Sequence, residues 1–371
     1  MSSTIDWAAI GDLARDFSVQ AAAREASLAP SDDQVERLRA IGVWDLAGAV
    51  EAGGGGASLA DLVEVVEDVA AGDLAPALLL AQRYAAFVAL RASGATDEAL
   101  VIQRRIIATE LTTALVAGRT DALRASEQAD GAVALSGRAT HVHGAGGIDA
   151  LLAIARLGEH EWVHALVTRD DEGVVVTRHD DILGLRRSVP FGTDFDGTPI
   201  ARGQVALDDA AHRDHGALGE AILAALTGAA VVGAARGSVE SAAALTRVRT
   251  IPRPVPGVTS PTQDPLSQVV LGAALVPIEG ARALVQAVAA DIDQGTLDTA
   301  AIRLRALAAL DVALDAGLEQ GEQVYEVVGT SGSGNRHGYD RLWRDVRTLS
   351  LAWPIRERRR ELGRRALVVS A

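Results

Sequence analysis

Apolar residues recur every three or four positions at both ends of the chain, which predicts helices there. Near the N-terminus, Ser31 and Asp32 offer an N-cap in front of one such repeat, and Ser58 with Asp61 has the spacing of a capping box in front of another. From residue 211 onward, four long segments rich in alanine and leucine are predicted to be helical: Leu218–Thr246, Pro265–Ile292, Thr299–Val328 and Arg336–Leu351. Long helices with short connections are typical of a bundle.

The middle of the chain instead shows short apolar runs separated by glycines. The runs expected to be strands contain Val133, Leu135 and Val142 and span Leu151–Ala155, Trp162–Thr168, Val174–Thr177 and Gly203–Leu207. This pattern predicts an antiparallel β module between helical flanks. We therefore expect a mainly α protein with three domains: N-terminal helices over residues 1–104, a central antiparallel β domain over 105–210, and a four-helix bundle over 211–371.

Four consecutive glycines, Gly53–Gly56, lie between two of the predicted N-terminal helices. Glycine runs can bind phosphate through their backbone N–H groups, but no strand precedes this one and neither GxGxxG nor Walker spacing is present. We interpret the run as a flexible turn.

Composition removes several kinds of chemistry. The formal charge of −14 argues against nucleic acid or an anionic membrane surface as the main partner. Cysteine is absent, which excludes disulfides, thiol nucleophiles and cysteine-ligated metals. All 35 basic residues are arginine, so the chain can form neither a lysine Schiff base nor a Walker P-loop. We attribute the missing lysine to a GC-rich genome.

No targeting segment is evident from the pattern. The first 30 residues include Asp6, Asp12 and Asp16 and lack the basic start and apolar run of a signal peptide. Uninterrupted apolar stretches such as Ala85–Leu90 and Ala229–Ala235 are too short to span a bilayer. We expect a cytoplasmic protein that does not act at a membrane.

The predicted domain layout resembles that of the acyl-CoA dehydrogenase superfamily. Several sequence stretches also resemble that superfamily, and they occur in the same order along the chain. These stretches are Gly42–Leu46 with Gly53–Glu67, Leu135–Ala145, Arg247–Thr250 with Asp264–Gly272, Gly329–Gly334 and Tyr339–Leu351. The last stretch is most similar to the reduced-flavin-dependent monooxygenases of the dibenzothiophene-monooxygenase type, through Asp340, Arg341, Trp343, Arg344, Arg347, Thr348 and Leu349. The proline-rich loop before Asp264 also resembles that branch.

The resemblance implies a flavin cofactor, FAD or FMN, bound in reduced form. By position, the residues that would contact it across a subunit interface are Arg249, Thr250, Gln268, Gly329, Thr330, Ser331 and Gly332. For Arg249, an ordinary surface ion pair is the alternative. Association through the C-terminal helices implies a homodimer or homotetramer. No nicotinamide fingerprint is visible, so a separate flavin reductase would supply the electrons.

The resemblance also shows what is missing. Trp353 stands where dehydrogenases commonly place their glutamate base, and Ala352 stands where the monooxygenases place a histidine. Some dehydrogenases carry the glutamate near the start of the first bundle helix instead, at about Leu223. Glu220, one turn earlier, is the candidate base there, and a solvated helix residue is the alternative.

His141 and His143 offer a replacement for the missing groups. They are two apart on a predicted strand, so both point to one face, which the resemblance places against the flavin. An imidazole at His143 could hydrogen-bond flavin N5 and deliver a proton near neutral pH. The alternatives are a metal-binding pair and two histidines in a polar loop. His337 could cap a helix or approach the cofactor, and the run Arg356–Arg365 is interpreted as a solvated, self-paired helix.

Three functions remain open. The first is a monooxygenase that uses reduced flavin and O₂ on a small heteroatom-containing or aromatic metabolite. The second is an acyl-CoA dehydrogenase with Glu220 as base, or a base-less subunit of a hetero-oligomer. The third is a non-catalytic homologue that binds flavin or a partner, because fold does not fix function.

Overall fold

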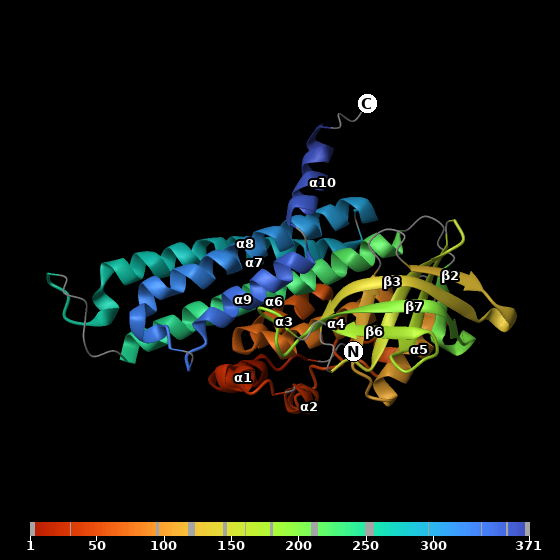
Figure 1. Ribbon diagram of the computed structural model, residues 1–371, viewed down its shortest axis with the longest axis horizontal. Helices are drawn as coiled ribbons and strands as arrows, with labels where there is room; N and C mark the ends of the chain where they lie inside the picture. Colours follow the sequence, from red (N-terminus) through yellow and green to blue (C-terminus); the bar gives the residue numbers. More distant parts are fainter. Residues whose placement is uncertain are drawn as a thin grey trace.

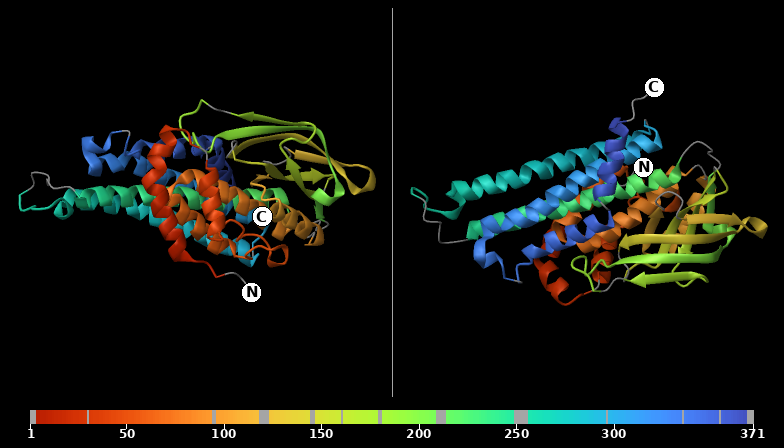
Figure 2. Two further views of the ribbon diagram at one scale, coloured as in Figure 1. Left: turned by 90° about the horizontal axis from the view of Figure 1, so that it is seen from below. Right: turned by 45° about the horizontal axis from the view of Figure 1, so that its top comes forward.

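The structure is a computed structural model. It describes residues 4–29, 31–93, 96–117, 123–143, 147–159, 161–178, 181–208, 214–248, 256–295, 297–334, 336–353 and 355–367, except for the side chains of His141, His143, Ser331, Ile355 and Arg365. Long helices lie side by side along the molecule, the sheet covers one end of them, and the N-terminal helices lie against their flank (Figures 1 and 2).

The N-terminal region is helical, as predicted. Its helices are α1 (Trp7–Ala26), α2 (Asp32–Ala40), α3 (Leu59–Gly72), α4 (Leu74–Ala92) and α5 (Thr96–Ala108), so α5 continues past residue 104. The Ser58 hydroxyl accepts the Asp61 N–H at 3.1 Å and caps α3, whereas the Ser31 side chain makes no capping bond to α2.

The glycine run forms a closed turn. The N–H groups of Gly54, Gly55 and Gly56 donate to backbone carbonyls of the preceding loop at 2.8–3.0 Å. Gly53 has φ 94°, which favours glycine. Because these amides are used internally, the run is a turn and not a phosphate loop.

The sheet is mixed rather than antiparallel. Its order is β6-β7-β3-β2-β4-β5-β8, and β1 pairs with β4 outside this path. Both β1 and β2 run parallel to β4. The bounds are β1 Thr113–Ala117, β2 Leu123–Glu127, β3 Val133–His143, β4 Ala150–Leu157, β5 Glu161–Thr168, β6 Val174–Arg178, β7 Pro190–Ile200 and β8 Val205–Asp208. The antiparallel prediction was wrong in this detail because alternation reports which face of a strand is buried, not the direction of its neighbour.

The C-terminal region contains the predicted long helices: α6 (His215–Val248), α7 (Pro265–Gln294), α8 (Thr299–Gly332) and α9 (Tyr339–Ala352). A further helix, α10 (Ile355–Leu367), projects from the bundle (Figure 1). The sequence suggested a helix that pairs with itself. Arg358 and Arg359 instead contact Asp311 of α8 at 2.8 and 2.7 Å, because these arginines face the bundle.

Helix α6 is the central helix, packed between α3 and α4 on one side and α7 and α8 on the other. Two glycines allow the closest approach. A Cβ at Gly233 would lie 2.0 Å from the Glu67 carbonyl oxygen, and one at Gly237 would lie 2.1 Å from the Ala71 carbonyl oxygen. Any larger residue would push α3 and α6 apart.

Within the described residues, α6 and α7 are each long and apolar enough to cross a bilayer, judged by length and composition alone. Uninterrupted apolar runs in the sequence underestimate the apolar length of both helices, because single polar residues interrupt each run. A buried core helix meets the same criterion, and the apolar part of α6 is 83% buried.

Candidate functional site

The end of β3 carries the strand positions of His141 and His143, whose side chains lie outside the described residues. Val142 pairs with Phe191, and His143 with Pro190, at the start of β7. Between Ala139 and Val142, β3 has three steps where β7 has two, so β3 contains a one-residue bulge. The prediction that His141 and His143 share a face requires an uninterrupted strand, and the bulge lies between Ala139 and Val142, a stretch that includes His141.

Helix α4 packs beside this strand end. A Leu79 methyl lies 3.5 Å from the Cβ position of Gly147, which follows the strand end along the chain. One turn later, Gln82 is 2% exposed, and its Oε1 has no hydrogen-bond partner among the described residues. Sequence reasoning missed Gln82, although a polar residue inside the apolar run Leu74–Leu90 was a visible signal. A buried, unsatisfied amide calls for a partner that a ligand or water would supply.

Glu220 lies in the second turn of α6, where the helix meets the sheet. The neighbouring Gly219 contacts β4 at Ile154 and β1 at Ala117. The Glu220 side chain is 8% exposed and forms an ion pair with Arg303, which also donates to Glu361 at 2.6 Å. The residue is therefore buried and paired, which is contrary to the solvated alternative.

The residues predicted to contact the cofactor either lie far from Glu220 or fall outside the described residues. Arg249 and Thr250 are outside the described residues, as is the Ser331 side chain. The exposed Gln268 donates to the Thr262 carbonyl at 3.0 Å. Gly329, with φ 60° and ψ −166°, interrupts α8 next to Thr330, and a Cβ there would meet no atom within 4 Å. Gly332 packs tightly against Val328.

These two groups lie at opposite ends of α6. Glu220 is near its start at the sheet, whereas Val328, next to the Gly329 interruption, lies in one apolar cluster with Tyr339 and with Ala242 near its end. At 1.5 Å per residue, Glu220 and Ala242 are about 33 Å apart along the helix. Within one chain, Glu220 therefore does not come together with the Gly329 interruption.

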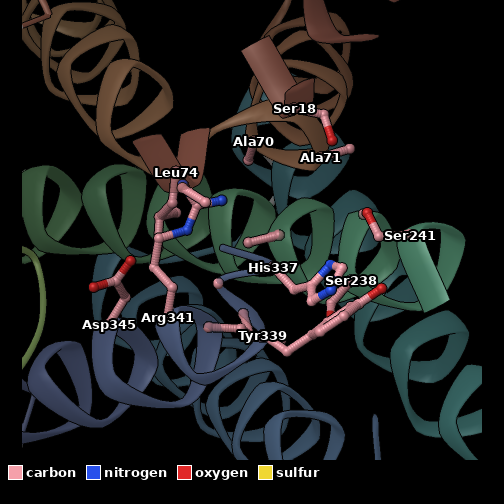
Figure 3. A pocket seen from close by; sticks show the side chains of 16 residues that line it. Ser18, Ala70, Ala71, Leu74, Ser238, Ser241, His337, Tyr339, Arg341 and Asp345 are labelled. Atoms are coloured by element: carbon pink, nitrogen blue, oxygen red, sulfur yellow. The ribbon is translucent and has the colours of Figure 1, made fainter. Parts of the chain in front are cut away.

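A cleft of about 600 Å³, open mouth included, lies between α1, α3, α6 and the start of α9 (Figure 3). Ser238, His337 and Arg341 contribute polar atoms to it. A second groove continues from it along α1 and α6 and shares Ser18 and Ser241. Among the described candidate residues from the sequence, only His337 lines this cleft. Its ring stacks on that of Tyr339, with ring centroids 6.1 Å apart.

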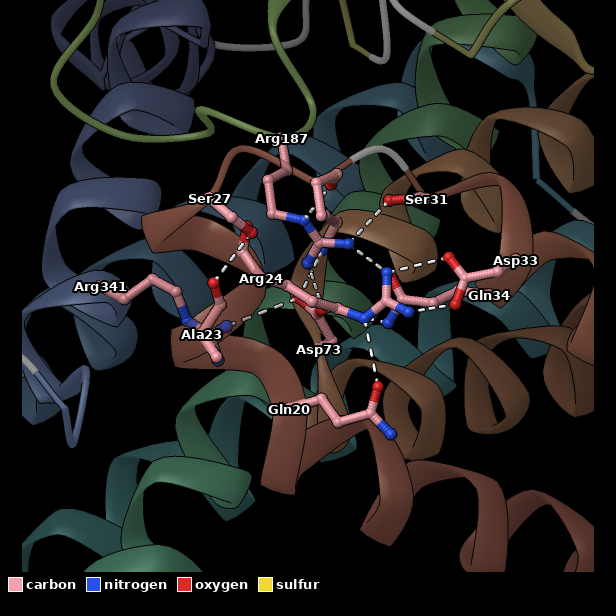
Figure 4. A network of polar contacts seen from close by, with 12 residues as sticks. Gln20, Ala23, Arg24, Ser27, Ser31, Asp33, Gln34, Asp73, Arg187 and Arg341 are labelled. Atoms are coloured by element: carbon pink, nitrogen blue, oxygen red, sulfur yellow. Dashed lines mark hydrogen bonds and ion pairs between the residues drawn. The ribbon is translucent and has the colours of Figure 1, made fainter.

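Beside the cleft, Asp345 of α9 is buried, and burial raises its pKa to about 7, against the opposing effect of Arg341 and of the Leu185 N–H. The Leu185 N–H donates to its Oδ1 at 2.6 Å. Next to it, Arg187 forms a buried ion pair with Asp73 and also contacts Gln34 (Figure 4). This buried polar network joins the β domain to the N-terminal helices and the bundle.

Among the described residues, no group of three or more histidine, aspartate or glutamate side chains is arranged so that it could hold a metal ion. The flavin implied by the resemblance is compatible with two features. The backbone at Gly329 is open to close approach, and the buried Gln82 Oε1 has no hydrogen-bond partner among the described residues.

The fold is that of acyl-CoA dehydrogenases: N-terminal helices, a central mixed sheet and a C-terminal helical domain. Residues 225–351 match the family model described as acyl-CoA dehydrogenase, C-terminal domain. The butyryl-CoA dehydrogenase of Megasphaera elsdenii superposes with a TM-score of 0.80 at 16% identity, over 99% of this chain and all of that one. The chain is therefore similar to the acyl-CoA dehydrogenases in fold throughout its length and in sequence over residues 225–351.

The chain is also similar to the dibenzothiophene monooxygenase type. It is 24% identical to the dibenzothiophene monooxygenase of Rhodococcus erythropolis over 96% of this chain and 91% of that protein. The complex of TdsC from Paenibacillus sp. A11-2 with FMN and indole superposes with a TM-score of 0.82 at 22% identity, covering 97% and 96% of the two chains.

Proposed function

We propose that this protein is the oxygenase component of a two-component flavin monooxygenase. It would take reduced flavin, FMN in preference to FAD, from a separate reductase and oxygenate a small heteroatom-containing or aromatic metabolite in the cytoplasm. The main support for the proposal is the similarity to dibenzothiophene monooxygenase, which extends over 96% of the chain and is not confined to the C-terminal helices. FMN in the TdsC complex supports the choice of flavin.

The pairing of Glu220 favours oxygenation over dehydrogenation. A dehydrogenase needs a carboxylate that can accept the α proton of its substrate. Glu220 is instead buried and already hydrogen-bonded to Arg303 in an ion pair. With Trp353 at the other family position, no described residue at either place is a free base.

Each of the chain's own residues then has a defined task. A bound reduced flavin would supply the electrons that let one atom of O₂ enter the substrate. His143, with His141 beside it, would hydrogen-bond the flavin edge and hold a proton there, and Gln82 would orient the substrate or flavin through its unpaired amide. Arg249, Thr250, Gln268 and Gly329–Gly332 would come from a second copy, because about 33 Å separates the two ends of α6 within one chain.

The second copy would dock on α7. Its outward face carries Leu266, Val269, Val276 and Leu284, which are 45–74% exposed. An apolar face of this length is typical of an interface between subunits. We therefore expect a homodimer or homotetramer.

The test combines the purified chain, a flavin reductase, NADH and FMN with indole under ¹⁸O₂. Mass spectrometry should find one ¹⁸O atom in the product, and Glu220→Gln should retain this activity. Flavin reduction by an acyl-CoA without O₂, lost in Glu220→Gln, would instead establish a dehydrogenase. The absence of both reactions over a panel of heteroaromatic and sulfur compounds would favour a non-catalytic homologue.

His143→Ala tests the proposed proton donor. Product formation should fall by about 10²–10⁴-fold while the reduced flavin releases H₂O₂. Val19→Ala, at an exposed position of α1, is the control and should keep product formation and peroxide release coupled. Coupling in His143→Ala within a few-fold of the unmodified protein would make His143 a structural residue.

A further inference from the structure

The loop between β6 and β7 is held in a strained conformation by α9. Residues 183–189, which we call the 183–189 loop, lead directly into β7. Within it, Leu185 is 3% exposed and has φ 57°, in the left-handed region that a leucine rarely adopts. Such a conformation costs about 1–3 kcal/mol and persists only where the surroundings impose it.

Three contacts from α9 impose it. The Leu185 N–H donates to Asp345 Oδ1 at 2.6 Å, and the Gly184 N–H donates to Thr348 Oγ1 at 3.0 Å. Arg344 donates to the Leu183 carbonyl at 3.2 Å. The backbones touch as well, because a Cβ at Gly184 would lie 2.1 Å from the Arg344 carbonyl oxygen.

The far end of the loop sets the place of the β3 end. Ser188 closes the loop by donating its N–H to the Leu185 carbonyl at 2.9 Å, and β7 begins two residues later at Pro190. Pro190 and Phe191 are the register partners of His143 and Val142. A shift of the loop would therefore move the strand that pairs with the end of β3.

We propose that Asp345 is a positioning residue: through Leu185 it holds the start of β7, and so the β3 end that carries His143, and the hold loosens when Asp345 loses its proton. Only the role of His143 in this chain of contacts rests on the proposed function. The mechanical link from α9 to β3 does not.

Asp345 is the carboxyl group at this contact between α9 and the 183–189 loop whose loss of a proton would loosen the loop. The charged groups around it are Arg341 and Arg344 on α9, Glu25 on α1, Asp73 between α3 and α4, and Arg186 and Arg187 on the loop. Glu25 is paired with Arg344, and Asp73 with Arg187, so both carboxylates have cationic partners. Burial raises the pKa of Asp345 to about 7. Ionisation above that pH leaves a buried charge, which opening of the loop would hydrate.

Amide hydrogen exchange between pH 6 and pH 8, corrected for the intrinsic rate, tests this link. Opening that releases one proton should become about tenfold more favourable over this interval and level off above pH 7. Residues 183–191 should therefore lose about tenfold in protection, and residues 138–143 should follow.

Asp345→Asn keeps the acceptor oxygen but cannot ionise, so protection should become independent of pH. Thr348→Val should raise exchange of the loop at both pH values and keep the pH dependence. Leu351→Ala, at an exposed position on the same helix, is the control and should change neither.

A tenfold pH effect that persists in Asp345→Asn would overturn the assignment. Loosening of 183–191 without any change in 138–143 would overturn the link to β3. Neither result depends on catalysis, so a chain that fails to oxygenate any compound can still pass or fail this test.

Discussion

Helices α6 and α7 are similar in length and apolar character but occupy opposite environments. The most apolar window of α6 is 83% buried, whereas that of α7 is 22% buried. Helix α6 meets α3 through Gly233 and Gly237, where backbones touch, while Gly272 and Gly280 of α7 have no atom near a would-be Cβ. The difference shows that apolar composition marks a helix for burial but does not say what buries it. For α6 the answer is its own chain, and for α7 we propose a second copy.

Glycine substitution in α6 should give the largest effect. Gly233→Ala places a methyl group 2.0 Å from the Glu67 carbonyl oxygen, where backbone and not a flexible side chain must move. We expect a loss of about 3 kcal/mol or more in the free energy of unfolding. Denaturant titration measures it, and an unchanged midpoint would mean that α3 and α6 are not in this close contact.

A charge on the outer face of α7 should break the proposed assembly. Val276→Asp puts a carboxylate where an apolar interface is expected and should weaken association by about 2 kcal/mol, roughly thirtyfold in the dissociation constant. Val19→Asp on α1, at an 86% exposed position, is the matched control and should leave association unchanged. Sedimentation measures both. A monomeric unmodified protein, or one that binds lipid vesicles through this face, would contradict the second-copy proposal.

Glu67 joins the two helices, because it accepts hydrogen bonds from Arg236 of α6 at 2.6 Å and from Arg282 of α7 at 3.0 Å. Burial outweighs these arginines and raises its pKa above 4.5. The folded state therefore holds this proton more tightly than the unfolded chain does, and the stabilisation that this provides is lost as pH rises from 4.5 through the folded pKa. Glu67→Gln should remove that decline in a stability–pH profile. An identical slope in both proteins would show that other groups dominate.

The smallest effect is expected on the exposed side of α7. Gly280→Ala meets no atom within 4 Å and replaces the poorest ordinary helix former by the best. Stability should be unchanged or rise by up to about 1 kcal/mol. Thermal unfolding beside Gly233→Ala makes the comparison direct, since a loss as large as that in α6 would mean that α7 is as tightly packed.

Sequence periodicity predicted the helices well, because long apolar repeats and caps such as Ser58 are local signals. Five strand runs were also found. The missed strands were β1, β2 and β7. The β7 segment starts with Pro190 and contains Gly192, Asp194 and Gly197, which locally favour turns, and it is a strand because β3 and β6 pair with it on both sides.

The candidate site was predictable only in part. The resemblance pointed to Glu220 near the start of the first bundle helix, but Arg303 lies 83 residues later and no local pattern could pair them. The same holds for Asp345 and Leu185, which are 160 residues apart. Burial of Gln82 and the strained Leu185 backbone follow from packing and not from any short motif.

The extra residue in β3 shifts the alternation of buried and exposed side chains by one position partway along the strand. Val133, Leu135 and Ala139 are buried at odd positions, and after the bulge the buried residue is Val142, at an even position. Deleting one residue between Ala139 and Val142 would restore a single alternation and leave Val142, then two positions after Ala139, on the buried face. Counting by twos from the start of the strand therefore assigns the wrong face to whatever follows residue 141, and a redesign of this strand has to count its two halves separately.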